Sequence, residues 1–108
     1  MTTRDMIAAV EREVLGWSGV SVAPGRFQST LFTVGRREIG HIHQDGIADF
    51  PFPRLLRDDL LPAGRVVPHR VGAAGYVSFA LRQEEDVAAA IALFRINYDR
   101  ASAASEAA

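Results

Sequence analysis

The chain has 108 residues, of which 48% are hydrophobic and 23% charged, a composition typical of a single globular domain. Its net charge is −1 and its pI is about 6.3, so we expect neither nucleic acid nor an anionic membrane as a partner. The sequence contains no cysteine and no lysine, which excludes disulfides, thiolate catalysis, cysteine-ligated zinc and Schiff-base chemistry.

The N-terminal segment carries acidic residues and has no continuous apolar core, so we do not expect it to act as a secretory signal. No apolar run in the sequence approaches the length that spans a lipid bilayer. We therefore expect a cytoplasmic protein.

The first half of the chain predicts one helix followed by four strands. Residues 3–15 carry apolar side chains at helical spacing, and we expect Thr3 to cap this helix and Gly16 to end it. Glycine-containing turns separate the next four apolar segments, which predicts strands over 19–22, 27–34, 37–43 and 47–52. Strands joined by such short turns pair in sequence as an antiparallel meander.

The second half predicts a short helix, a hairpin and a long helix. Proline at position 53 suits the first turn of a helix, which we expect over 53–61. Two strand-like segments, 65–71 and 75–82, predict a hairpin. A final helix is expected over 84–100, because acidic residues begin the segment and apolar residues recur along one face. We expect the alanine-rich tail over 101–108 to be disordered.

Together these elements predict a single α+β domain over residues 1–100, with no internal repeat and no linker. One antiparallel sheet, made of the meander and the C-terminal hairpin, is expected to pack against the N-terminal, middle and C-terminal helices.

Two of the three histidines lie in one predicted hairpin, within the segment REIGHIHQDGIADFPFP at residues 37–53. Side chains two apart on a strand share a face. Regular alternation therefore puts His41 and His43 on one face together with Ile39, and it puts Glu38 and Gly40 on the other.

The turn that follows decides the partner of His41. A two-residue turn at Asp45-Gly46 would place His41 opposite Phe50. A three-residue loop with Gly46 in the left-handed conformation would instead place His41 opposite Asp49. We favour the three-residue loop, because it gives a histidine on an apolar face a carboxylate partner.

The hairpin supports three interpretations. A histidine–aspartate pair is suited to acid–base catalysis near neutral pH. Two histidines on one strand face also provide half of a metal site, for which Asp49, Glu38 or His69 would supply the third ligand. In the third interpretation the histidines only complete the hydrogen bonds of the sheet, and another surface binds a ligand or a protein.

The hairpin and the segments after it resemble the small bacterial luciferase-family domains, which are named for their similarity to fungal luciferase. The resemblance covers about residues 17–98 and includes GYVSFALRQEEDVAAAIALFRINYD. Its most specific parts are the motif Arg37-Glu38-Ile39-Gly40-His41-x-His43, then Asp49 with the Pro-Phe-Pro that follows it, and His69.

This resemblance implies a reaction similar to that of fungal luciferase, which oxidises a hydroxypyrone with molecular oxygen and needs no metal or organic cofactor. It implies a histidine base that deprotonates an enol within a polar lining of Glu38, His41, His43, Asp49 and His69. The chain is much shorter than that enzyme, so substrate-binding regions can be missing, and the name alone does not imply light emission.

We therefore expect a cofactor-free, oxygenase-like enzyme that acts on an unidentified small molecule. The alternatives are a non-catalytic ligand-binding or protein-interaction module and, third, a metal site at the two histidines. The sequence does not distinguish a monomer from a homodimer. The candidate catalytic residues are His41, His43, Asp49 and Glu38, and the candidate ligand-binding residues are His69, Arg37, Phe50 and Tyr76.

Overall fold

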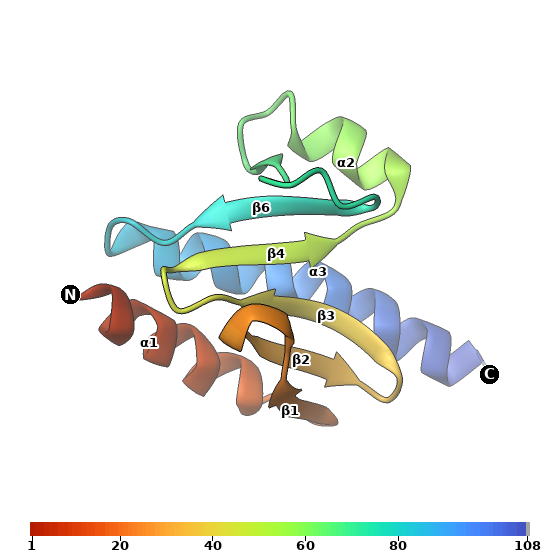
Figure 1. Cartoon of the computed structure of the whole chain (residues 1–108). Helices are drawn as coiled ribbons and strands as arrows, with labels where there is room; N and C mark the ends of the chain where they lie inside the picture. Colours follow the sequence, from red (N-terminus) through yellow and green to blue (C-terminus); the bar gives the residue numbers. More distant parts are fainter. Residues whose placement is uncertain (108) are drawn as a thin grey trace.

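The computed structural model describes residues 1–107, and it confirms the predicted α+β fold (Figure 1). In chain order the elements are α1 (Thr3–Leu15), β1 (Val20–Pro24), the short 3-10 helix η1 (Arg26–Gln28), β2 (Thr30–Val34), β3 (Arg37–Ile42), β4 (Ile47–Pro51), α2 (Arg54–Leu60), β5 (Val67–Pro68), β6 (Tyr76–Ala80) and α3 (Glu85–Ala107). The strands form one antiparallel sheet in the order β1-β2-β3-β4-β6-β5, so the predicted meander is extended by the C-terminal hairpin.

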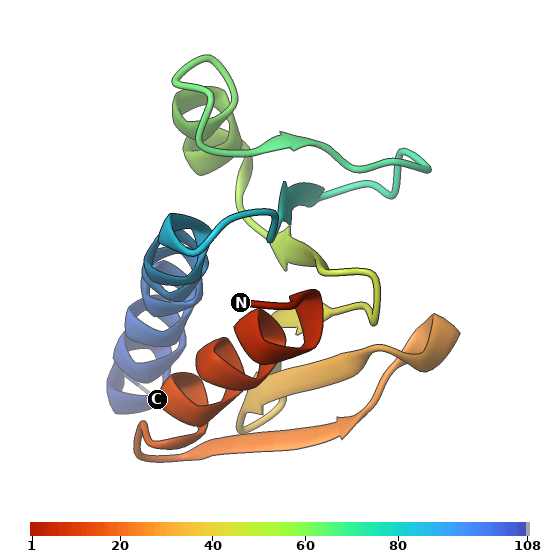
Figure 2. The same cartoon turned by 90° about the vertical axis from the view of Figure 1, so that its left-hand side faces the viewer.

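The helices α1 and α3 lie side by side on one face of the sheet, whereas η1 and the segment between β5 and β6 project on the opposite side (Figure 2). The core lies under the two helices and is built around three aromatic rings. The Phe94 ring of α3 packs edge-on against Phe32, at 5.1 Å between centroids, and against Phe50, at 4.8 Å. None of the described helices has a stretch long and apolar enough to cross a membrane.

A β-bulge in β3 decides which residues face the helices. Phe32 of β2 is paired with Gly40 and the next residue, Thr33, with Glu38, so Ile39 is an extra residue on β3. The side chain of Ile39 is fully buried. Because an extra residue shifts the alternation by one position, Glu38 shares a face with His41, and the predicted placement of Ile39 beside the histidines is wrong.

Two features of α3 fit the bulge. A Cβ atom on Gly40 would lie 2.5 Å from Cε1 of Phe94, so only glycine allows the strand to approach the helix this closely. The buried Asn97 donates from Nδ2 to the carbonyl oxygens of Ile39, at 3.2 Å, and of Pro51, at 2.8 Å. The helix therefore holds β3 at its irregular point.

The ends of several elements differ from the sequence expectation. Thr2, not Thr3, caps α1, because its side chain and that of Asp5 bond reciprocally to each other's backbone amides. The strand expected over 27–34 begins only at Thr30, because η1 occupies the preceding residues. In the strand expected over 65–71, only residues 67 and 68 pair with β6.

The last helix is longer than expected. It continues to Ala107 instead of ending near residue 100, so the expected disorder is corrected for residues 101–107. Alanine has the highest helix propensity, and Ala101 is buried, so part of the tail joins the core. Ala108, the last residue of the expected tail, lies outside the described residues.

Candidate functional site

The loop between β3 and β4 aligns the two strands so that a histidine meets a carboxylate. Gly46 has a φ of +90°, and its amide donates to the carbonyl of His43 at 3.0 Å. The amide of His43 in turn donates to Ile47, so three residues form the loop. His41 is consequently paired with Asp49, and the favoured register is confirmed.

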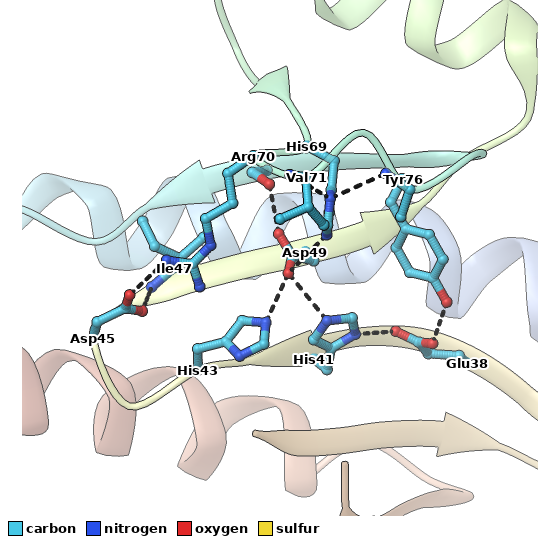
Figure 3. Close-up of polar contacts among 12 residues, drawn as sticks. Glu38, His41, His43, Asp45, Ile47, Asp49, His69, Arg70, Val71 and Tyr76 are labelled. Carbon is cyan, nitrogen blue, oxygen red and sulfur yellow. Dashed lines mark hydrogen bonds and ion pairs between the residues drawn. The ribbon is translucent and has the colours of Figure 1, made fainter. Parts of the chain in front are cut away.

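Asp49 is the centre of a hydrogen-bonded cluster in which three imidazoles converge on one carboxylate oxygen (Figure 3). Oδ2 of Asp49 lies 2.8 Å from Nε2 of His43, 3.1 Å from Nε2 of His41 and 3.5 Å from Nε2 of His69. Its other oxygen, Oδ1, accepts a 2.5 Å hydrogen bond from the Ser78 hydroxyl. The Asp49 side chain is fully buried.

The cluster keeps Asp49 ionised despite its burial. Burial alone acts to raise the pKa of this carboxyl, because it removes water from the charged form. The hydrogen bonds from His41, Ser78 and His43 outweigh that effect and hold the pKa of Asp49 well below its usual range. A buried carboxylate with this many donors is a fixed negative charge at neutral pH.

His41 is held between two carboxylates and is therefore a cation. Its Nε2 faces Asp49, and its Nδ1 lies 2.7 Å from Oε2 of Glu38. Burial acts to lower the pKa of His41, but the hydrogen bonds to Asp49 and Glu38 outweigh it and raise the pKa to about 9. Both ring nitrogens carry hydrogen in this state, so His41 has no lone pair with which to accept a proton.

Tyr76 closes the outer end of the cluster. Its hydroxyl donates to Oε1 of Glu38 at 2.6 Å, so both oxygens of that carboxylate are engaged. Burial and this hydrogen bond together raise the pKa of Tyr76 to about 12. The phenol therefore stays protonated and fixes the orientation of Glu38.

His43 and His69 present their rings differently. Nδ1 of His43 has no hydrogen-bond partner among the described residues. Every buried side-chain N or O atom of these residues has a partner, so an unpaired nitrogen such as this one must be accessible to solvent. Nδ1 of His69 instead accepts from the backbone amides of Val71 and Ala73, both at 3.3 Å. Of the three histidines, His43 alone therefore has a free nitrogen.

The cluster forms the floor of a cavity of about 840 Å³ on the face of the sheet that α1 and α3 leave uncovered. Two loops supply its walls: residues 24–29, around η1, and residues 69–73, after β5. Phe27 lines the cavity although its side chain is 86% exposed, and both it and Gln28 have left-handed backbones, with φ of 54° and 61°. Such backbone outliers cost free energy and cluster at binding sites.

Six of the eight sequence candidates line this one cavity: Glu38, His41, His43, Asp49, His69 and Tyr76. Arg37 lines a separate cavity of about 260 Å³ instead, together with Glu38 and Tyr76, which border both. Phe50 was expected to bind a ligand, but its ring is fully buried against Phe94 on the helix-covered face, so this expectation is corrected.

Sequence reasoning missed Ser78 and Phe27. Strand alternation in 75–82 turns Ser78 away from the apolar side chains, but its link to Asp49 needs the pairing of β6 with β4, which no local pattern indicates. Phe27 was expected in a strand, and nothing in the sequence indicates its left-handed conformation.

His41, His43 and Asp49 are also the group of described side chains that could hold a metal ion, since one ligand atom from each lies within 4.8 Å of the others. His69 is a poor further ligand in this arrangement. Because its Nδ1 accepts two amide hydrogens, its own proton resides on Nε2, the nitrogen that faces the cluster.

Comparison with known proteins identifies the family. The model of a family described as "Luciferase domain" matches residues 36–97, which is more than half of the chain and includes the whole polar cluster. No curated protein and no solved structure matches the chain. The chain belongs to the luciferase-domain family.

Proposed function

We propose that this domain is a cofactor-free, oxygenase-like enzyme that binds a small, largely apolar molecule and removes a proton from an acidic hydroxyl group on it. Two observations support the proposal. The cavity combines apolar walls with a polar floor, which is the usual construction of a small-molecule site. The family match spans that floor.

The observation that carries the proposal is the free nitrogen of His43. In the neutral ring the proton is on Nε2, where Asp49 accepts it at 2.8 Å, and Nδ1 is left as an accessible acceptor on the cavity floor. This is the arrangement of a catalytic histidine: a carboxylate fixes the tautomer on one side, and the other nitrogen accepts the substrate proton. The roles of Nδ1 and Nε2 are exchanged relative to serine proteases.

The charge of the floor suits this step. Asp49 and Glu38 as carboxylates and His41 as an imidazolium leave a net charge of −1 around the His43 ring. When the substrate hydroxyl transfers its proton to Nδ1, His43 becomes an imidazolium, and the adjacent Asp49 stabilises it.

The same charge favours a neutral substrate over an anion at the floor, because like charges repel strongly at low dielectric. Apolar side chains that line the cavity, among them Leu31, Phe27 and Val71, would contact the rest of the molecule. An enol or a phenol meets both requirements. Its anion is electron-rich, and by resemblance to fungal luciferase we propose molecular oxygen as its reaction partner.

Oxygen consumption with a panel of enolic and phenolic compounds tests the proposal. Binding is first detected by chemical-shift changes of the His43 ring, and uptake of oxygen is then measured with each compound that binds. The matched variant is His43→Gln, in which the amide group can still donate to Asp49 but no base remains. Asp58→Asn, on the exposed face of α2, is the control.

We expect His43→Gln to bind the same compounds and to lose oxygen uptake by about two orders of magnitude or more, a typical contribution of a general base. Equal uptake by the wild type and His43→Gln would refute the role of His43. Binding by the wild type with no uptake for any compound would favour a non-catalytic ligand-binding module.

A metal site is the second candidate, and the observation in its favour is the convergence of His41, His43 and Asp49 within 4.8 Å. Elemental analysis of untagged protein, beside a His41→Ala/His43→Ala variant, separates the two candidates. Stoichiometric metal in the wild type that is lost in the variant would replace the cofactor-free proposal. Absence of bound metal after incubation with Fe²⁺ and Zn²⁺ would eliminate the metal site.

A further inference from the structure

The imidazole of His69 contacts both a loop at the rim of the cavity and the carboxylate at the centre of its floor. On one side Nδ1 accepts from the amides of Val71 and Ala73, in the loop after β5. On the other side Nε2 lies 3.5 Å from Oδ2 of Asp49 on the cavity floor. We infer that His69 is a positioning residue that couples the placement of this loop, residues 70–74, to Asp49.

The hydrogen-bond geometry fixes which nitrogen of His69 carries the proton. An imidazole nitrogen that accepts from an amide has no hydrogen of its own, so Nδ1 is bare and the proton of the neutral ring is on Nε2. That N–H faces the buried negative charge of Asp49. The tautomer with its proton on Nε2 accepts from the loop amides and also turns its N–H towards Asp49. The other tautomer can do neither.

Few other polar contacts hold the loop to the domain. Among the described residues, the side chain of Arg70 joins this loop to another part of the fold through an ion pair with Asp45, at 2.7 Å. Both of these side chains are about half exposed. Exposed ion pairs contribute little to stability. The shielded contact is therefore that of His69, whose side chain is only 12% exposed.

The loop matters for the site because it forms one wall of the cavity. Val71 and Ala73, the residues whose amides His69 holds, both line it, and the side chain of Val71 is 81% exposed. A rotation of the His69 ring that moved Nε2 from Asp49 would also move Nδ1 from the loop. The wall and the polar contacts of Asp49 consequently change together.

As a role in catalysis this inference rests on the proposed function, but the coupling itself can be measured without a substrate. Amide hydrogen exchange at Val71 and Ala73 reports how often the loop leaves His69. The exchange rates are measured in the wild type, Asp49→Asn, His69→Asn and the double variant, and exchange at Val10 in the core serves as the control for global stability.

His69→Asn is the informative substitution. The asparagine side-chain oxygen can take the place of Nδ1 as the acceptor for the loop amides, but asparagine is too short to reach Asp49. We expect Asp49→Asn to accelerate exchange at Val71 and Ala73 by about tenfold when His69 is present, and to leave it unchanged in the His69→Asn background. The exchange rate at Val10 should not follow this pattern.

Equal acceleration by Asp49→Asn in both backgrounds, or acceleration in neither, would overturn the coupling. A second measurement does not depend on any variant: the ring-nitrogen NMR shifts of His69 should identify the tautomer with the proton on Nε2, and a proton on Nδ1 would contradict the inference. If the coupling is intact but the wild type takes up no oxygen with any compound of the panel above, the enzyme is refuted and the role of His69 stands.

Discussion

His41 and Asp49 are direct partners across strands β3 and β4, and their side chains meet at 3.1 Å between Nε2 and Oδ2. The opposite nitrogen of His41 is bonded to Glu38, so the ring is a cation that two carboxylates share. This relationship makes the site a charged network in which His43 has a free ring nitrogen and His41 a fixed positive charge. The network and the packing that holds it can each be tested by titration and by substitution.

The charge of His41 predicts a loss of stability in alkaline solution. Its pKa in the folded protein is raised to about 9, against 6.5 for an ordinary histidine. A raised pKa means that the folded state binds the proton more tightly, so the stabilisation is complete below about pH 6.5 and is lost as the pH rises through 9. Unfolding by urea between pH 6 and 10, in buffer with a chelator, should show this decline.

NMR titration of the His41 ring is the direct check of this prediction. We expect its carbon-bound protons to titrate with a midpoint near pH 9, and a midpoint near 6.5 would contradict the shared-cation assignment. In Glu38→Gln one of the two anionic partners is gone, so the midpoint of His41 should fall towards its ordinary value.

Removal of the Asp49 carboxylate should be strongly destabilising. Asp49→Ala would leave the His41 cation with a single carboxylate and the buried Ser78 hydroxyl without its partner. Breaking a buried ion pair from one side costs about 3–5 kcal/mol. The free energy of unfolding measures this loss, and Asp58→Asn, which is exposed, should change it by less than about 0.5 kcal/mol. A loss below about 1 kcal/mol for Asp49→Ala would show that the cluster is not buried as described.

Substitution of Gly40 should disturb the core and the site together. In Gly40→Ala the new Cβ would lie 2.5 Å from Phe94 and about 3 Å from Phe50, which forces the strand and α3 apart. Overpacking of this kind typically costs about 1–3 kcal/mol. Thermal unfolding should show a lowered midpoint, and Phe94→Leu in the same chain should recover part of the loss. A double variant less stable than the sum of the two single changes would exclude steric conflict as the cause.

Asn97 should stabilise the bulge through its amide group. Asn97→Leu keeps a similar volume but leaves the carbonyls of Ile39 and Pro51 without their donor. Unpaired buried carbonyls cost about 1–3 kcal/mol, and we expect that loss together with a shift of the His41 resonances, because Glu38 and His41 flank the bulge. Unchanged His41 resonances would mean that the bulge holds its shape without Asn97.

The register of the histidine hairpin could be predicted because it depends on local chemistry. Gly46 allows a left-handed residue, and the three-residue loop that it permits places a carboxylate opposite His41. The placement of Glu38 could not be predicted. It depends on the extra residue at Ile39, and this irregularity is held by contacts with α3, more than fifty residues further along the chain.

The other predictions divide in the same way: features that depend on neighbouring residues could be predicted, and features that depend on the pairing of distant segments could not. The bounds of α1 follow from its own caps and periodicity, whereas the contact of Ser78 with Asp49 follows from the pairing of β4 with β6. Phe50 would lie opposite His41 with a two-residue turn, but the three-residue loop pairs His41 with Asp49 instead. In the fold Phe50 is on the opposite face of the sheet, since neighbouring positions on a strand alternate.

Glu38 and His41 are three positions apart, a separation that usually joins neighbours on a helix and not on a strand. They meet here because the strand is longer by one residue than its partner between them. The extra residue therefore lets Ile39 and Gly40 both face the helices while Glu38 stays beside His41. Deletion of Ile39 would restore regular alternation, with Glu38 two positions before His41 and still on the same face. His41 would keep both carboxylates beside it, so the loss of that one codon would remove a buried side chain from the core and leave the polar network in place.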